Sequence, residues 1–157
     1  MKTAVVYYSY DGNCAFVAEQ IAALLKADLV QIQTVDQKKR RGFLKMLWGG
    51  AQVMFGKLPP LKPVNFDAVS FDLIILGTPV WASSPAPAMK AFLSQTKFSG
   101  KKVALFMCHA GGMGEAMNKF KSMLTDNTIV SEIDFSTLLK NQEKAKQQIE
   151  EWVKKLN

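Results

Sequence analysis

Residues 4–18 decide the fold class, and they read AVVYYSYDGNCAFVA. The five residues 4–8 form a continuous apolar run of the kind found in buried strands. After the polar residues 9–12, apolar side chains recur at helical spacing, at Val17, Ala18, Ile21, Ala22 and Leu25. A strand followed by a short loop and a helix is the first half of a βαβ unit. This stretch therefore predicts an α/β fold with a parallel sheet.

Four further strand-like runs follow. Residues 73–76 and 103–107 are continuously apolar, whereas residues 29–32 and 129–135 alternate apolar and polar side chains. Strands covered by helices on both faces are continuously apolar, and edge strands tolerate alternation. Right-handed crossovers then give the strand order 2-1-3-4-5. We therefore expect a three-layer α/β/α sandwich with a five-stranded parallel sheet, forming one domain over residues 1–157.

Three more helices are predicted outside residues 4–25. One begins near Ser84-Pro85, which is typical of an N-cap followed by the first helical position. The other two are indicated by apolar spacing: one from about Arg41 to Phe55, and one at the carboxyl end that contains Ala145, Ile149, Trp152, Val153 and Leu156. The proline-rich residues 57–65 are expected to form an ordered crossing loop.

The strand order predicts where a ligand binds. In such a sheet the ligand lies beyond the carboxyl ends of the first and third strands, so the loops after Tyr8, Leu76 and Met107 are the candidates. The first loop, Ser9 to Cys14, offers backbone N–H donors at a helix N-terminus, which favour an anion. It has no lysine or arginine, and the spaced glycines of dinucleotide-binding loops are missing. A phosphate pocket and a tight turn capped by Asn13 both fit these residues.

The other two loops also carry distinctive residues. Trp81 lies in the second loop, where a large exposed indole is unfavourable. A flat aromatic ligand would explain it, and so would packing of Trp81 onto its own domain or a partner subunit. The third loop, Cys108 to Gly114, has three glycines that allow a close approach to a ligand.

Two of these motifs resemble those of a known family. The run from Val5 to Ala18 resembles the flavodoxin signature, with Ser9 as its hydroxyl and Gly12 as its small residue. The stretch GTPVW, residues 77–81, is similar to the loop that packs beside the isoalloxazine ring in flavodoxin-fold proteins. Both motifs fall within the first two-thirds of the chain, in the order that the family has them. The resemblance implies a short-chain flavodoxin-like protein that binds one FMN.

The resemblance also implies which residues contact FMN. They are Ser9, Tyr10, Asp11, Gly12, Asn13 and Cys14 around the phosphate, Thr78, Pro79, Val80, Trp81 and Ala82 beside the ring, and His109, Ala110, Gly111 and Gly112 at its other side and pyrimidine edge. The third loop lacks the tyrosine that many flavodoxins stack there, so the second ring face is covered by backbone or open to a substrate. His109 is either a donor to the flavin or to a hydride acceptor, or incidental.

The chain departs from the flavodoxin pattern at two positions. Cys14 and Asp11 stand where flavodoxins usually or often carry threonines. A thiol is a weaker donor than a hydroxyl, and a carboxylate repels a phosphate unless it is turned away. Because Cys14 lies at a helix N-terminus, we expect its thiol pKa to be lowered.

Composition and charge narrow the class of protein. Twenty basic and 13 acidic residues give a net charge of +7, which attracts anionic ligands and acidic protein surfaces. The basic run Lys38–Arg41 is better explained as the solvated end of an amphipathic helix than as a nucleic-acid or membrane surface. No stretch approaches the ~20 apolar residues of a membrane span. The two distant cysteines, Cys14 and Cys108, suit the reduced cytoplasm, and no Cys/His cluster predicts a metal site.

Other classes with similar folds do not fit. A response-regulator receiver requires a phosphoacceptor aspartate after the third strand, where this chain has Gly77-Thr78-Pro79. A low-molecular-weight phosphatase requires a cysteine and an arginine that bracket its loop, and neither cysteine has that arginine.

Within the flavin interpretation we expect an electron-transfer carrier with an acidic redox partner. The alternative is an NAD(P)H-dependent flavin or quinone reductase acting on a small acceptor. A remote alternative is a non-catalytic binding module. The chain is expected to be a monomer or homodimer, and binding to nucleic acid or insertion into a membrane is not expected.

Overall fold

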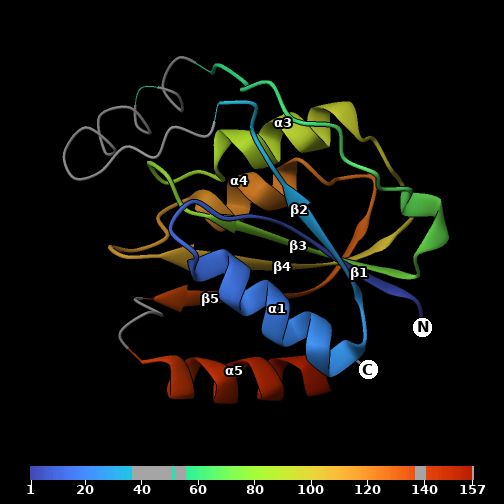
Figure 1. The fold of residues 1–157 in the computed structure, drawn as a ribbon, viewed down its shortest axis with the longest axis vertical. Helices are drawn as coiled ribbons and strands as arrows, with labels where there is room; N and C mark the ends of the chain where they lie inside the picture. The colour runs from blue at the N-terminus through green and yellow to red at the C-terminus, as the bar shows by residue number, and fades with distance from the viewer. Residues whose placement is uncertain (37–50, 52–55, 137–140, 157) are drawn as a thin grey trace.

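The computed structural model describes residues 1–36, 51, 56–136 and 141–156. Its sheet contains five parallel strands in the order β2-β1-β3-β4-β5, which confirms the order predicted from the sequence (Figure 1). The strands are β1 (Thr3–Tyr8), β2 (Asp28–Ile32), β3 (Leu73–Pro79), β4 (Lys102–His109) and β5 (Thr128–Ser136). The helices are α1 (Asn13–Leu25), α3 (Pro87–Gln95), α4 (Ala116–Ser122) and α5 (Gln142–Lys154), with a 3-10 turn, η1 (Ala68–Ser70).

Helices cover both faces of the sheet. In Figure 1, α3 and α4 lie on one side of the strands and α1 and α5 on the other. Each pair has its own buried cluster, with Phe92 and Phe120 on the first side and Ile21 and Ile149 on the second. The indole N–H of Trp152 donates to Ser131 Oγ at 2.8 Å, which fixes α5 against β5. The result is the predicted three-layer sandwich.

Burial along the strands confirms which of them lie at the edges. Every residue of β1 is buried, as are the first six of β3, whereas burial alternates along β5 and most of β2 is exposed. At the centre of the sheet Gly77 faces Phe106 across the β3–β4 ladder. A Cβ at Gly77 would collide with the Phe106 ring. Glycine is therefore required here by close packing.

One helix starts later than the sequence suggests. The prediction placed its start at Ser84-Pro85, but α3 begins at Pro87. Ser84 instead closes a turn with Trp81, and Thr78 Oγ1 accepts a hydrogen bond from the N–H of Ala86 at 3.1 Å. These bonds hold the segment in a non-helical conformation. The helix expected over residues 41–55 lies almost wholly outside the described residues.

The crossing loop of residues 57–65 pairs with the chain that follows β2. The N–H of Val35 donates to the Pro60 carbonyl at 2.9 Å, and the N–H of Lys62 donates to the Gln33 carbonyl at 2.8 Å. An antiparallel bridge joins Thr34 and Leu61 between these bonds. The loop is therefore anchored as predicted. Across the described ranges of the chain, no helix has both the length and the apolar character needed to cross a bilayer.

Candidate functional site

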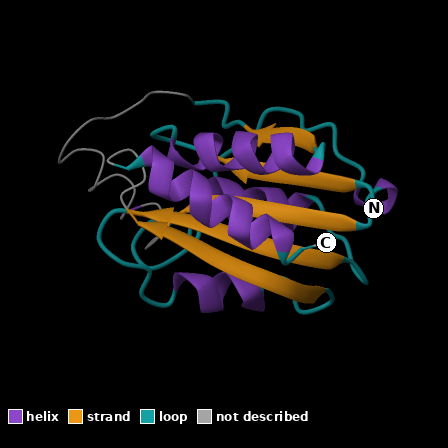
Figure 2. Ribbon diagram, turned by 90° about the horizontal axis from the view of Figure 1, so that it is seen from below, coloured by secondary structure: helices purple, strands orange, loops and turns teal. Residues whose placement is uncertain are grey.

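The three candidate loops lie at one edge of the sheet. Because the strands are parallel, their arrowheads all point to this edge in Figure 2, and the loops after β1, β3 and β4 follow them. The N–H of Val80 donates to the Cys108 carbonyl at 2.9 Å, which joins the second loop to the end of β4. A Cβ at Gly114 would collide with Ser83, so the second and third loops also approach each other beyond the sheet.

The first loop contains two buried polar atoms in need of a partner. Among the described residues, Ser9 Oγ and Asn13 Oδ1 are buried and make no hydrogen bond. Leaving such an atom unpaired typically costs about 1–3 kcal/mol. A serine hydroxyl can donate to a phosphate oxygen, and an amide oxygen can accept from a hydroxyl of a ribityl chain. The loop therefore fits the phosphate end of FMN.

The cap of α1 supports the same interpretation. The N-cap is Gly12, with a left-handed φ of 93°, and no side chain caps the helix. Asn13 is the first helical residue, so the alternative of a turn capped by Asn13 is wrong. The side chain of Asn13 is thus not used by the helix end. An anion would find the uncapped N–H groups of the first turn available.

The expected low thiol pKa of Cys14 is also wrong. Its side chain is only 1% exposed and packs in the core beside α5. Burial raises its pKa well above the ordinary value, and a hydrogen bond with Cys108 adds to this effect. Desolvation outweighs the helix N-terminus because the thiol points into the core. Only the backbone of Cys14 stays a candidate phosphate contact.

The thiols give a testable outcome. We expect Cys14 and Cys108 to resist alkylation in the folded protein at neutral pH, with or without FMN, because both are buried and Cys14 stays a neutral thiol. Both should react fully in denaturant. The measurement is mass spectrometry after timed exposure to iodoacetamide. Rapid labelling of Cys14 in the folded protein would contradict its position in the core.

The second loop is held in a strained turn. Trp81 and Ser84 exchange backbone hydrogen bonds of 2.9 and 3.1 Å. Between them Ala82 and Ser83 both have left-handed backbones, with φ of 47° and 54°. Such a conformation costs about 1–2 kcal/mol per non-glycine residue. Strain of this kind tends to occur at functional sites. Ser84 Oγ is a third buried atom without a hydrogen-bond partner in the described parts of the chain.

Trp81 packs against two tyrosines that the sequence analysis did not connect with it. Its ring meets Tyr10 edge-on at 5.4 Å and Tyr8 at 6.1 Å between centroids. Burial, followed by the proximity of Tyr10 and Asp11, raises the pKa of Tyr8 to about 12. Tyr8 therefore stays a protonated donor at neutral pH. Trp81 thus packs on its own domain in this structure, and its contact with the flavin stays a prediction.

His109 orders the third loop. Its Nδ1 accepts the N–H of Gly112 at 3.0 Å, so in this arrangement Nε2 carries the hydrogen and donates to Asp134 Oδ2 at 3.0 Å. Both ring nitrogens are therefore engaged within the protein. From the sequence alone, His109 is either a donor to a ligand or an incidental residue. One sequence signal could have linked His109 with Asp134. It is the alternation of β5, which places Asp134 on the face opposite to that of Phe135.

The sheet and these loops define a flavodoxin-like protein, and comparisons with known proteins agree. The model of the NADPH-dependent FMN reductase family matches residues 1–138, and the chain belongs to this family. FMN is therefore its cofactor. No curated protein sequence matches the chain.

Solved structures show the same fold. A flavoprotein from Lactobacillus acidophilus in complex with FMN is 23% identical, covers 96% of this chain and 97% of its own, and has a TM-score of 0.77. A putative flavoprotein from Bacteroides uniformis is 19% identical, with coverages of 95% and 97% and a TM-score of 0.80. Flavodoxin 2 from Bacillus cereus is 17% identical, with coverages of 99% and 97% and a TM-score of 0.62.

Proposed function

We propose that the protein is an FMN-dependent oxidoreductase that takes electrons from NAD(P)H and passes them to a small acceptor. The family match to NADPH-dependent FMN reductases carries this proposal. FMN supplies the redox chemistry, because its ring accepts two electrons from a nicotinamide and releases them to another acceptor. The protein's own residues bind the cofactor, orient its ring and leave room for the nicotinamide.

Three groups of residues share this work in the proposal. Ser9, Asn13 and the amides of residues 10–14 bind the phosphate end. Thr78 shapes the second loop, since its hydroxyl accepts the Ala86 N–H, and Trp81 flanks the ring. His109 is a positioning residue, which holds the backbone of Gly112 in place through Nδ1.

The third loop leaves space where a nicotinamide would approach. Cβ atoms placed on Gly111 and Gly112 would have no neighbour within 4 Å in the described structure. No aromatic residue occurs between His109 and Gly114. An aromatic side chain that could stack on the second ring face is thus missing from this loop, which favours a reductase over a carrier whose ring is stacked between aromatic residues on both faces.

Anaerobic addition of NADPH to the FMN-loaded protein tests the proposal. We expect NADPH to abolish the visible absorbance of the bound flavin, and this absorbance to return when a small quinone is added in excess over the remaining NADPH. NADH is tested in parallel, and the nucleotide that reduces the flavin faster is the preferred donor. A flavin that stays oxidised with both nucleotides would exclude the reductase.

A carrier function is the second candidate, and the charge of the chain indicates what kind of partner it would have. At +7 the protein attracts acidic surfaces, so an acidic redox protein is the expected partner. Electron transfer to such a partner should slow as salt is raised, because surface charges are screened beyond ~10 Å at 0.1 M. A cytoplasmic location and a monomeric or homodimeric state are part of this proposal.

Replacing Trp81 by alanine tests the proposed ring contact. We expect FMN to quench the Trp81 emission in the wild-type protein, and Trp81→Ala to weaken FMN binding by about 0.5–1.5 kcal/mol or more, as for an aromatic pair. Fluorescence titration measures both. Trp48 and Trp152 also emit, so Trp152→Phe is the control and should retain both the quenching and the affinity. Unchanged affinity in Trp81→Ala would assign this indole to packing alone.

A further inference from the structure

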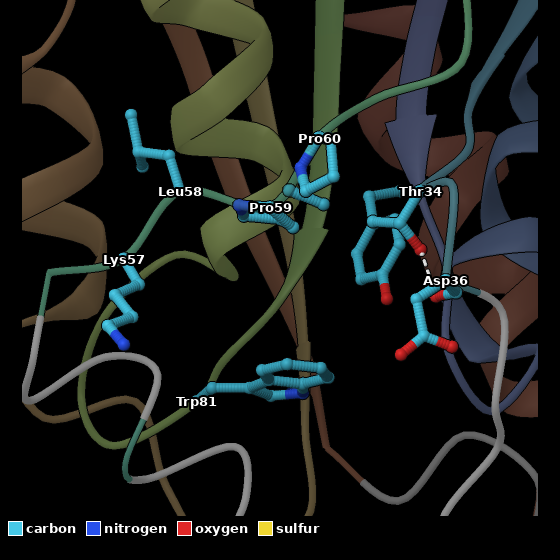
Figure 3. A pocket seen from close by; sticks show the side chains of 9 residues that line it. Thr34, Asp36, Lys57, Leu58, Pro59, Pro60 and Trp81 are labelled. Carbon is cyan, nitrogen blue, oxygen red and sulfur yellow. Dashed lines mark hydrogen bonds between the residues drawn. The ribbon is translucent and has the colours of Figure 1, made fainter.

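The tip of the third loop is not fixed by side-chain packing. Residues 110–112 are exposed, and Cβ atoms placed on Gly111 and Gly112 would have no neighbour within 4 Å among the described atoms. The large side chain of the second loop, Trp81, is turned toward the crossing loop. In Figure 3 its indole lies below two prolines of that loop, across a cavity of about 250 Å³. The position of Gly112 therefore depends on hydrogen bonding.

The hydrogen bond of Gly112 determines which tautomer of His109 the loop needs. The N–H of Gly112 donates to Nδ1 at 3.0 Å, so Nδ1 carries a lone pair and no hydrogen. Asp134 Oδ2 lies 3.0 Å from Nε2 and accepts the hydrogen there. Because a carboxylate only accepts hydrogen bonds, Asp134 disfavours the other neutral tautomer, in which two acceptors would face each other. Asp134 thus positions Gly112 through the imidazole ring.

Protonation of His109 is incompatible with this arrangement. An imidazolium carries a hydrogen on both nitrogens, so its Nδ1–H would face the N–H of Gly112, and two donors cannot form a hydrogen bond. The contact with Asp134 is kept and becomes an ion pair. Gly112 is therefore the partner that is released. A loop tip without a defined position has to be ordered again when a ligand binds, which weakens binding.

The charges around the ring belong to the neighbouring elements. They are Glu132 on β5, Glu115, Lys119 and Lys121 along α4 and its N-cap, and Asp11 in the first loop. Glu132 and Lys121 pair with each other at 2.9 Å. Residues 80–87 and 110–114 of the other two loops contain no charged side chain. Within the part of the chain that the structure describes, Asp134 is the charged group that contacts His109.

We propose that Asp134 and His109 form a proton-controlled clamp on Gly112, so that FMN binding weakens below the pH at which His109 ionises. The proposal rests on the position of the third loop beside the flavin in the proposed function. It assigns to Asp134, which no sequence motif indicated, the role of a positioning residue.

The chain offers few other groups that change charge in the same range. His109 is its only histidine, and histidine is the side chain that ordinarily ionises between pH 5 and 8. Burial raises the pKa of the Cys14 thiol further above this range. The α-amino group precedes β1 and lies at the opposite edge of the sheet from the third loop.

NMR of the FMN-free, ¹⁵N-labelled protein tests the clamp itself. We expect the Gly112 amide to shift between pH 8 and 5 with the same midpoint as the His109 ring nitrogens, and the ring to carry its hydrogen on Nε2 at pH 8. Gly100 is the matched control, because it also has a left-handed φ, of 69°, and its N–H donates to the Asp126 carbonyl at 2.7 Å. Its amide should not follow this midpoint. A Gly112 amide that does not follow His109, or a hydrogen on Nδ1 at pH 8, would overturn the proposal.

Fluorescence titration of FMN at pH 8 and pH 5.5 tests the consequence for the cofactor. A phosphate monoester takes up a proton near pH 6, so the wild type is compared with His109→Gln, in which the effect of the phosphate remains. We expect the affinity of the wild type to fall about three- to tenfold further than that of the variant, as for the loss of one hydrogen bond. An equal fall in the two proteins, or a smaller fall in the wild type, would contradict the clamp.

Replacing Asp134 by asparagine tests the positioning residue. Asp134→Asn removes the charge that favours the imidazolium, so the transition of Gly112 should move to lower pH by about a few tenths of a unit, as for a half-exposed ion pair. Glu132→Gln is the matched control, because Glu132 lies two residues earlier on β5 and pairs with Lys121. It should move the transition clearly less. Equal displacements in the two variants, or none in Asp134→Asn, would reject the role of Asp134.

These outcomes are independent of the reductase assay, because none of the measurements uses NADPH. If NADPH fails to reduce the flavin while Gly112 follows His109 and FMN binding weakens at low pH, the proposed reductase is wrong and the clamp stands. If reduction is normal and the wild type and His109→Gln depend on pH alike, the clamp is wrong and the reductase stands.

Discussion

Replacing Ser9 by alanine is expected to weaken FMN binding about ten- to a hundredfold. A hydrogen bond to a charged group contributes about 1.5–3 kcal/mol, and 1.4 kcal/mol corresponds to a factor of ten. Ser9 Oγ is buried and makes no hydrogen bond to any described residue, so its donor is free for a phosphate. No lysine or arginine in the loop would compensate for its loss.

Riboflavin separates this effect from a general loss of structure. Because riboflavin lacks the phosphate, its affinity for the wild-type protein should be much lower than that of FMN. Its affinity for Ser9→Ala should be about the same as its affinity for the wild type. Asn13→Asp should likewise disfavour FMN selectively, because it places a carboxylate at the first position of α1. Ser122→Ala, at the end of α4 and remote from the loops, is the control. Equal affinities of FMN and riboflavin for the wild type would show that the loop is only a turn.

The fold could be predicted from the sequence because the pattern of apolar side chains in each strand indicates which of its faces are buried. The continuous runs at 73–76 and 103–107 required helices on both faces, and the alternation at 129–135 placed that strand at an edge. The start of α3 was predicted wrongly. Ser84-Pro85 is a good local capping signal, but the Thr78 side chain, eight residues before Ala86, accepts the N–H of Ala86, and this residue becomes the N-cap of α3. Local propensity cannot detect such a bond.

The candidate site was predictable only in outline. The strand order selected three loops that do lie at one edge of the sheet, yet the contacts within them depend on residues far apart in the chain. His109 reaches Asp134 across 25 residues, and Trp81 reaches Tyr8 and Tyr10 across about 70. The direction of the Cys14 side chain was missed for the same reason. A helix N-terminus predicts a low thiol pKa only where the thiol faces solvent, and here the first turn directs it toward Cys108.

Gly77→Ala is expected to lower the free energy of unfolding by about 1–3 kcal/mol, the usual cost of inserting a methyl group into a packed core. Any Cβ at this position meets the Phe106 ring, which is fully buried between β4 and the α1–α5 core and has no free space to enter. Urea denaturation of the FMN-free protein measures the loss as a lower midpoint with an unchanged slope. Gly111→Ala is the matched control, because its Cβ meets nothing within 4 Å of the described atoms and its φ is not left-handed.

The double variant Gly77→Ala/Phe106→Leu identifies the collision as the cause. Phe106→Leu alone leaves a cavity and is destabilising, but the smaller side chain makes room for the new methyl group. The two changes should therefore cost less together than the sum of their separate costs, by about 0.5 kcal/mol or more. Additive costs would mean that alanine is disfavoured here for another reason.

Gly77 also immediately precedes Thr78, and the Val80–Cys108 hydrogen bond ties that segment to the end of β4. A displacement of β3 from β4 would move the second and third loops apart. Gly77→Ala should therefore weaken FMN binding as well as lower the free energy of unfolding. Gly77→Ala/Phe106→Leu should recover part of the FMN affinity and part of the stability.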